Sequence, residues 1–125
     1  MIHALAIFLG GGAGAVARHG VNGLAFRAFG SGFPVGTLTV NVVGSLLMGL
    51  LIGVLAARSQ GDELVRLAVA TGFLGGFTTF SAFSLDALTL WQRGESAAAA
   101  GYVFASVGLS LAAVVAGFAL SRSLI

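Results

Sequence analysis

The sequence has 125 residues, of which 58% are hydrophobic and 8% are charged, and its formal net charge is +2. A soluble domain of this length could not bury so much apolar surface, so the composition indicates an integral membrane protein. The absence of cysteine excludes disulfides and cysteine-based metal sites, and the six scattered arginines form no basic patch for nucleic acid.

Apolar runs predict four membrane-spanning helices in one membrane domain, residues 1–125. The spans are expected at about residues 2–24, 35–57, 64–91 and 97–120, each with room for the ~20 helical residues that cross a bilayer. Pro34 suits the first turn of the second helix. The expected fold class is therefore all-α, with short polar connections and no soluble domain.

Small residues at a spacing of four indicate close helix contacts in the first two spans. Gly10 and Gly14 share one face of the first span, and Ser45, Gly49 and Gly53 share one face of the second. Such residues let membrane helices approach closely, so we expect both faces to pack against neighbouring helices.

Polar side chains form one stripe on the second span and another on the fourth. The stripes are Thr37, Asn41 and Ser45, and Tyr102, Ser106 and Ser110. The simpler interpretation is that these residues make hydrogen bonds between helices. The Asn41 amide, however, carries two donor hydrogens that need partners in hydrocarbon. We interpret the two stripes as walls of a narrow polar path.

The third span combines glycines with four hydroxyl residues and four phenylalanines within residues 72–84. Gly75 and Gly76 weaken the helix and free main-chain carbonyls, which lipid cannot satisfy. Such a break is tolerated only against protein or a water-filled cavity. We therefore expect the third helix to be broken in the middle of the membrane, beside a polar site.

Two phenylalanines near this break have an alternative to ordinary core packing. Phe80 and Phe83 share a face if the helix resumes after the glycines. Because an aromatic ring has a positive edge, ring edges beside Thr79, Ser81 and Asn41 could coordinate a small anion without a fixed charge. Such a site suits an ion that must both bind and leave.

Arg18 and Asp86 lie near the ends of spans. Each of them has two possible roles. Arg18 could attract anions into a vestibule or extend to the membrane interface. Asp86 could stand at a pore mouth or simply at a helix end. The sequence contains no nucleophile–base pair and no metal-ligand cluster, so we expect no enzymatic activity.

The arginines are balanced between the two sides of the predicted bundle. One side carries Arg58, Arg66 and Arg122, and the other carries Arg18, Arg27 and Arg93. Because cationic residues normally select the cytoplasmic side, this balance predicts insertion in both orientations and an antiparallel homodimer. The alternative is that one loop or a partner protein decides the orientation.

Three motifs resemble those of the Fluc/CrcB family of fluoride channels. They are GFLGGFTTFSAFSLD at residues 72–86, GTLTVNVVG at residues 36–44 and GGGAGAVAR at residues 10–18. The first motif is highly specific, whereas the glycine-rich third motif alone is weak. Length, number of spans and motif order also match, so the resemblance extends over essentially the whole chain.

The resemblance implies a passive, fluoride-selective channel of the bacterial inner membrane that exports cytoplasmic fluoride and confers fluoride resistance. It also implies an antiparallel, dual-topology homodimer in lipid, with two pores that each draw on both subunits. The implied pore residues are Phe80 and Phe83 as fluoride-facing rings, Asn41 as a donor to the ion, and Tyr102, Ser106 and Ser110 as a polar track. Arg18 matches the first-span arginine of the family.

A structural Na⁺ on the dimer axis is a further implication of the resemblance, held by the main-chain carbonyls of Gly75 and Thr78. This chain departs from the family's pattern at Asp86, where glutamate is common, and at Ala82, where a hydroxyl residue often occurs. The first departure keeps the charge. The second puts any role of that hydroxyl in doubt for this chain.

Other functions remain open from the sequence. A proton-coupled small multidrug exporter is also a four-span, dual-topology dimer, but it needs an ionisable carboxylate deep in a span, and the first span has none. A non-transporting assembly or scaffold subunit would instead co-purify with a larger complex and tolerate Asn41→Ala in an ion assay.

Overall fold

The computed structural model describes residues 1–57 and 63–124, which are helical apart from short connections. The elements are α1 (Ile2–Phe29), α2 (Val35–Ala57), α3 (Glu63–Val65), the π-helix η1 (Arg66–Leu74), α4 (Gly75–Phe77), α5 (Phe80–Gln92) and α6 (Ser96–Leu124). Four stretches are long and apolar enough to cross a membrane, namely α1, α2, residues 63–92 and α6. The prediction of an all-helical, multi-pass membrane protein is therefore confirmed. Arg58, part of the predicted arginine balance, lies outside the described residues.

Helix α1 extends further than the expected end near residue 24. It continues to Phe29, because Arg27 is itself a good helix former and does not end the helix. Gly30 ends it with a φ of 76°, and the Gly30 N–H donates to the carbonyl of Phe26. Glycine adopts this positive φ without steric penalty. The connection to α2 is consequently short.

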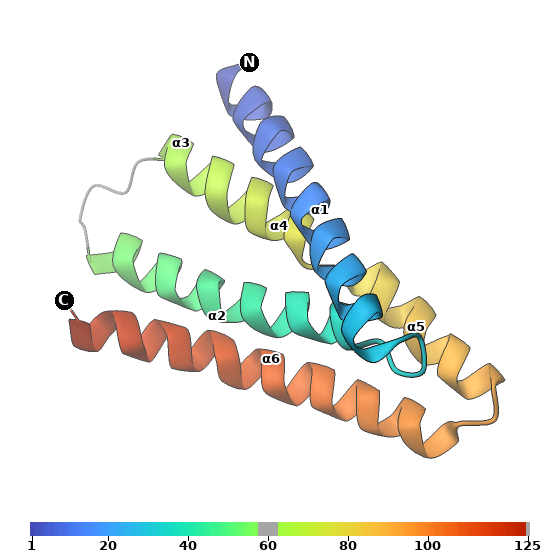
Figure 1. Ribbon diagram of the computed structural model, residues 1–125. Coiled ribbons are helices and arrows are strands. Elements are labelled where there is room, and N and C mark those ends of the chain that lie inside the picture. The colour runs from blue at the N-terminus through green and yellow to red at the C-terminus, as the bar shows by residue number, and fades with distance from the viewer. Residues whose placement is uncertain (58–62, 125) are drawn as a thin grey trace.

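Two pairs of packed helices form the frame of the molecule. Helix α2 packs along α6, and α1 packs along η1 and α4 (Figure 1). Gly49 lies against the carbonyl of Val114, and Gly14 lies against the carbonyl of Phe73, each so closely that a Cβ atom would clash with the backbone. Glycine is thus required where these helices approach, as the spacing of small residues in the first two spans predicted.

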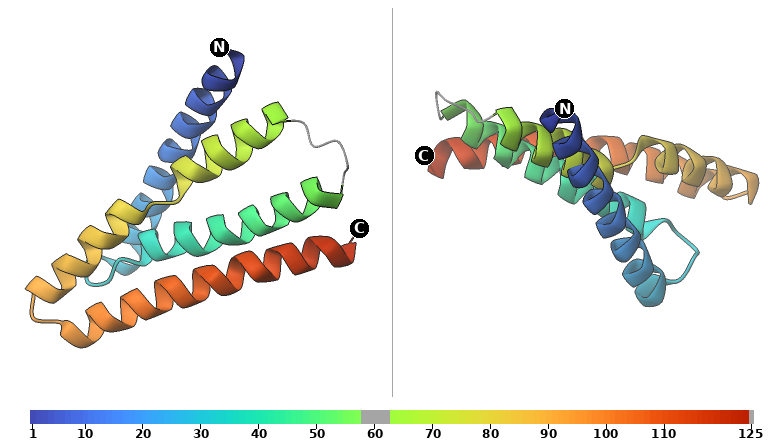
Figure 2. Two further views of the ribbon diagram at one scale, coloured as in Figure 1. Left: turned by 180° about the vertical axis from the view of Figure 1, so that it is seen from behind. Right: turned by 90° about the horizontal axis from the view of Figure 1, so that it is seen from above.

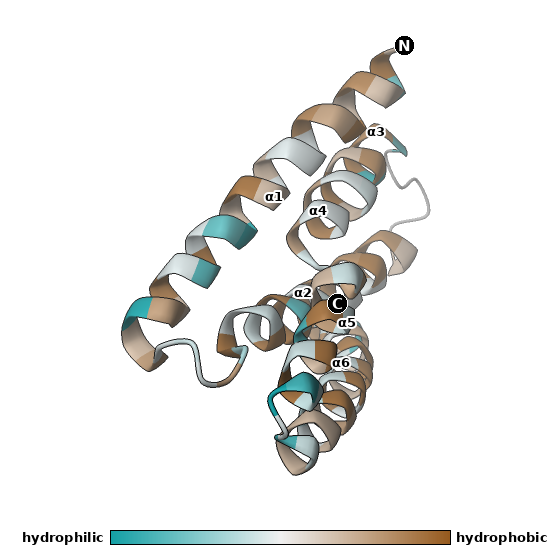
Figure 3. Cartoon of the chain, turned by 90° about the vertical axis from the view of Figure 1, so that its right-hand side faces the viewer, coloured by the Kyte–Doolittle hydropathy of each residue, from teal (hydrophilic) through white to brown (hydrophobic). Residues whose placement is uncertain are grey.

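The long helices spread apart from the end at which α5 connects to α6 (Figure 2). Many large apolar side chains on their outer sides are exposed, and hydrophobic residues extend along every long helix (Figure 3). Examples are Phe8, Val16, Phe29, Leu85 and Phe104. Leaving such surface in water is unfavourable by about 25 cal/mol per Å². Lipid, or another copy of the chain, removes this penalty.

The backbone leaves helical geometry between α4 and α5 (Figure 1). Thr78 has φ −86° and ψ 161°, and Thr79 has φ −155° and ψ 123°, so both residues are extended. The preceding segment, η1, is π-helical over nine residues. Segments of π-helix are rare and often occur at functional sites. The polar groups around Thr78 and Thr79 therefore determine what this part of the chain can bind.

Candidate functional site

A groove of about 400 Å³, with a few polar side chains in a mainly apolar lining, lies between α2, the α4–α5 junction and α6. Its lining residues are Asn41, Gly44, Ser45, Met48, Thr78, Thr79, Phe80, Phe83, Ser106, Val107, Ser110, Leu111 and Val114. The groove brings together residues that are up to 73 positions apart, from Asn41 to Val114 (114 − 41). Most pore residues predicted from the sequence lie on this one surface.

Asn41 makes two hydrogen bonds to the extended backbone of Thr79. Its Nδ2 donates to the Thr79 carbonyl at 3.0 Å, and its Oδ1 accepts from the Thr79 N–H at 2.8 Å. The side-chain amide therefore substitutes for the helical partners that Thr79 lacks. A primary amide has two donor hydrogens, so one Nδ2 hydrogen remains for the groove. The simpler interpretation of the polar stripe, a hydrogen bond between helices, is therefore confirmed for Asn41, and its role as a donor to an ion stays a prediction.

Hydroxyl groups complete the local hydrogen bonding of the α4–α5 junction. The Thr78 N–H and Oγ1 both donate to the Leu74 carbonyl, at 3.0 and 2.9 Å. Thr79 is the N-cap of α5, where its Oγ1 accepts from the Ala82 N–H at 3.1 Å. An N-cap threonine typically stabilises a helix by about 1 kcal/mol. The helix can therefore restart directly after two extended residues.

Arg18 contacts the junction from α1. Its Nε donates to the carbonyl of Gly76 at 3.1 Å. In a continuous helix that carbonyl would accept from the N–H of Phe80, but α5 only begins there. Arg18 lines neither the groove nor the second cavity described below. Neither the vestibule nor the interface interpretation anticipated this contact with a carbonyl.

A row of aromatic rings extends from the groove into the core. The ring centroids of Phe80 and Phe83 are 5.4 Å apart, and those of Phe83 and Tyr102 are 5.3 Å apart. Phe33 meets the far side of Tyr102 at 5.5 Å, with the rings almost perpendicular. Phe83 is 8% exposed, whereas Phe80 is 77% exposed in the single chain. The Phe80 ring therefore stands at the open side of the groove.

Two serines of α6 face the groove with unused hydrogen-bonding capacity. Ser106 Oγ and Ser110 Oγ are buried and make no well-formed hydrogen bond in the part of the chain that the structure describes, although Ser106 lies close enough to the Tyr102 hydroxyl to interact with it. An unsatisfied buried polar group costs roughly 1–3 kcal/mol, so native proteins rarely leave one without a reason. A polar guest in the groove would supply the missing partner.

Tyr102 lies behind the groove lining, where its ring contacts Phe83. It is fully buried, and its hydroxyl donates to Asp86 Oδ2 at 3.1 Å. Asp86 lines a second cavity, of about 320 Å³. This outer cavity lies between α1, the α1–α2 connection, the start of α2 and α5. Asp86 therefore lines this cavity and also accepts a hydrogen bond from Tyr102, whereas its role at a pore mouth stays a prediction.

The remaining predicted residues lie beside the groove. Ser81 is exposed and does not line the groove, although its Oγ is 3.3 Å from Thr79 Oγ1. Gly75 is exposed at the start of α4. Sequence reasoning missed Thr89 and Arg93, which line the outer cavity with Asp86. Their spacing of three and seven residues after Asp86 places all three on one helix face, so the signal was present.

Comparison with known proteins identifies the family. A family model described as CrcB-like protein, Camphor Resistance (CrcB), matches residues 5–118. A Paracoccus denitrificans protein named fluoride-specific ion channel FluC is 57% identical over 120 residues, or 96% of this chain and 94% of the relative. The Rhizobium johnstonii protein of the same name is 52% identical over 124 residues, 99% of each chain. The resemblance of the three motifs is thus confirmed, and the chain belongs to the CrcB family.

Proposed function

We propose that this chain is a fluoride-selective channel through which fluoride leaves the cytoplasm passively, down its electrochemical gradient. The observation that carries the proposal is the pair of buried serine hydroxyls, Ser106 and Ser110, that make no well-formed hydrogen bond among the described residues, in a groove that Phe80 and Phe83 border. The names of the relatives from Paracoccus denitrificans and Rhizobium johnstonii support the same ion. The multi-pass fold and the family point to a bacterial inner membrane as the site of action.

The groove replaces the water shell of the ion in steps. The hydroxyls of Ser106 and Ser110 donate to the anion, and the second Nδ2 hydrogen of Asn41 adds a donor at the junction. The ring edges of Phe80 and Phe83 carry partial positive charge and offer further weak contacts. Because no fixed charge lines this groove, the anion binds weakly enough to leave again. The narrow polar path excludes larger anions such as chloride.

A second copy in the opposite orientation completes each pore in this proposal. Phe80 is largely exposed in the single chain, so one wall of the groove is missing until another copy covers it. The balance of arginines supports insertion in both orientations. Two copies related by a two-fold axis then form two equivalent pores. The α4–α5 junction lies in the middle of the membrane, against the partner and away from lipid.

Opposite orientations can be measured directly because the chain has no native cysteine. Ser123→Cys places one thiol at an exposed position near the end of α6. In sealed vesicles, a membrane-impermeant maleimide is expected to label about half of the chains before permeabilisation and all of them afterwards. Labelling of all chains, or of none, in sealed vesicles would contradict the antiparallel pairing.

The exposed carbonyls at the junction fit a structural Na⁺ at the two-fold axis. The usual helical donor to the Gly75 carbonyl is the Thr79 N–H, which donates to Asn41 instead, and Gly75 is exposed. Main-chain oxygens of Gly75 and Thr78 are the hard ligands that such a cation prefers. When bound, Na⁺ would neutralise the facing carbonyl dipoles of two copies. Exchange of sodium for a large organic cation is expected to weaken the dimer, as measured by cross-linking, and an unchanged cross-linked yield would contradict this site.

Fluoride efflux from liposomes tests the proposed function. Purified protein is reconstituted into liposomes loaded with potassium fluoride, and valinomycin is added so that potassium can follow. We expect rapid fluoride release into the medium, and no release of chloride under matched conditions. Fluoride release no faster than from protein-free liposomes would overturn the proposal. Uptake of a cationic dye driven by a proton gradient would favour the multidrug exporter instead, and stable capture of a larger complex without ion flux would favour a scaffold subunit.

A further inference from the structure

The outer cavity and the groove differ in the charge of the residues that line them. Its polar lining residues are Asn22, Ser31, Thr37, Asp86, Thr89 and Arg93. Asp86 is the acid of this set and Arg93 is the base, whereas the groove is lined without a charged residue. Tyr102 contacts a lining residue of each cavity, because its ring packs against Phe83 of the groove and its hydroxyl donates to Asp86 of the outer cavity.

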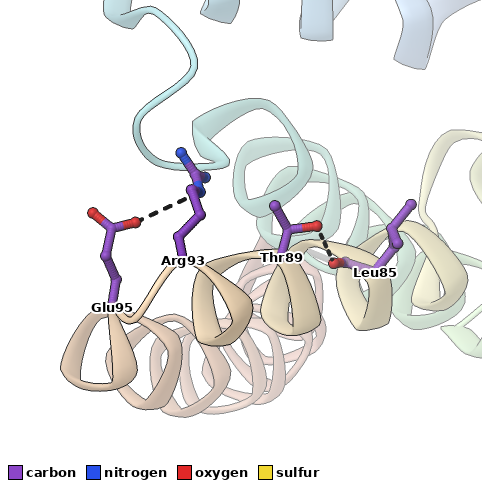
Figure 4. Close-up of polar contacts among 4 residues, drawn as sticks. All are labelled: Leu85, Thr89, Arg93 and Glu95. Atoms are coloured by element: carbon purple, nitrogen blue, oxygen red, sulfur yellow. Dashed lines mark hydrogen bonds and ion pairs between the residues drawn. The ribbon is translucent and has the colours of Figure 1, made fainter.

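The acid and the base of the outer cavity lie at different depths. Asp86 is half-buried, and its carboxylate accepts a hydrogen bond from Tyr102. The carboxylate therefore lies toward the protein interior. The side chain of Arg93 is 44% exposed at the rim. Figure 4 shows Arg93 projecting from the end of α5 toward the α1–α2 connection, on the same side as Thr89. An anion that approaches from outside therefore meets the guanidinium before the carboxylate.

Of Thr89 and Arg93, which both line this cavity, only Arg93 has hydrogen-bond donors available for an anion. The Thr89 hydroxyl donates its hydrogen to the Leu85 carbonyl at 2.9 Å (Figure 4), so it offers lone pairs rather than a proton to an anion. The guanidinium has five donor hydrogens. Its ion pair with Glu95 is long, with Arg93 Nε and Glu95 Oε2 3.7 Å apart, and both side chains are almost half exposed. Glu95 thus reduces the field of Arg93 only in part.

We propose that the outer cavity is a mouth of the ion route and that Arg93 concentrates a small inorganic anion there before it passes Tyr102. This inference rests on the proposed function. It adds Arg93 as a residue at the rim that influences how fast the anion reaches the groove. A charge at the mouth of a cavity with low-dielectric walls raises the local concentration of the opposite ion, and added salt screens this effect. Arg93 should therefore influence the rate of entry most strongly at low ionic strength.

The test compares initial fluoride efflux rates at two ionic strengths, with fluoride held constant and potassium gluconate added on both sides of the membrane. Screening lengths are about 30 Å at 0.01 M and about 3 Å at 1 M. Arg93→Gln is expected to reduce the rate roughly threefold at the low ionic strength and to leave it close to wild type at the high one. Glu95→Gln is expected to raise the low-salt rate, and Arg93→Lys, which keeps the charge, should resemble the wild type.

Arg27→Gln is the matched control, because Arg27 is an exposed arginine in the last turn of α1 that does not line the cavity. Its effect should be smaller than that of Arg93→Gln. A wild-type rate for Arg93→Gln at low salt, an equal loss at both ionic strengths, or a loss in Arg93→Lys equal to that in Arg93→Gln would overturn the assignment. A wild-type protein without fluoride flux would instead overturn the proposed function, so the two failures are distinguishable.

Discussion

Asn41→Leu is expected to abolish fluoride efflux and to destabilise the protein. Leucine removes both hydrogen bonds to Thr79 and leaves its N–H and carbonyl without their side-chain partner. An unsatisfied buried group costs roughly 1–3 kcal/mol, and because these two groups are only partly buried, the total loss should lie near the lower end of that range. The extended backbone at Thr79 would no longer be fixed, and the groove residues on α5 would lose their position. Efflux from liposomes and thermal unfolding in detergent measure the two effects.

Thr39→Val is the control for Asn41→Leu. Thr39 lies on the same helix and is exposed, and among the residues that the structure describes its hydroxyl bonds only to the Val35 carbonyl of its own helix. This substitution also removes a polar group from α2, but it leaves the α4–α5 junction intact. We expect efflux and the unfolding temperature to stay close to wild type. Wild-type efflux and stability in Asn41→Leu would show that the junction does not depend on this amide.

Phe83→Ile is expected to lower fluoride flux strongly without disrupting the proposed dimer. Isoleucine keeps an apolar side chain in the core, a change that usually costs less than about 1.5 kcal/mol when volume is nearly conserved. It removes the polarised ring edge at the groove and the ring contact with Tyr102. If one edge contact is worth about 2 kcal/mol in a desolvated site, as for a comparable cation–π contact, the rate falls roughly 30-fold. Phe80→Ile is expected to act in the same direction.

The matched control for both phenylalanines is Phe104→Ile. Phe104 is on α6 and is 78% exposed in the single chain, and it does not line the groove. Efflux should remain at the wild-type level in this variant, and chemical cross-linking should show a dimer in all three. Unchanged flux in both Phe80→Ile and Phe83→Ile would contradict the ring-edge mechanism, even if the chain still conducts fluoride.

Much of the candidate site could be predicted from short-range patterns. Ser106 and Ser110 were recognisable because a spacing of four places them on one helix face. Residues of the α4–α5 junction were recognisable because glycines and hydroxyl residues weaken a helix inside an apolar span. These are local properties of the chain. The homodimer, the Na⁺ site and the roles of the pore residues remain predictions that the experiments above address.

Apolar patterning along the chain is sufficient to predict four membrane-spanning helices, since lipid admits only apolar segments whose backbone groups are satisfied internally. Which polar groups meet depends on how these helices pack. Arg18 and Gly76 are 58 residues apart, and Asn41 and Thr79 are 38 apart, and these pairs meet because of how the helices pack. That packing depends on close backbone contacts at glycines such as Gly14 and Gly49. Hydrogen bonds between helices are sensitive to shifts of a few tenths of an ångström, and residue spacing along one helix carries no information about its neighbour.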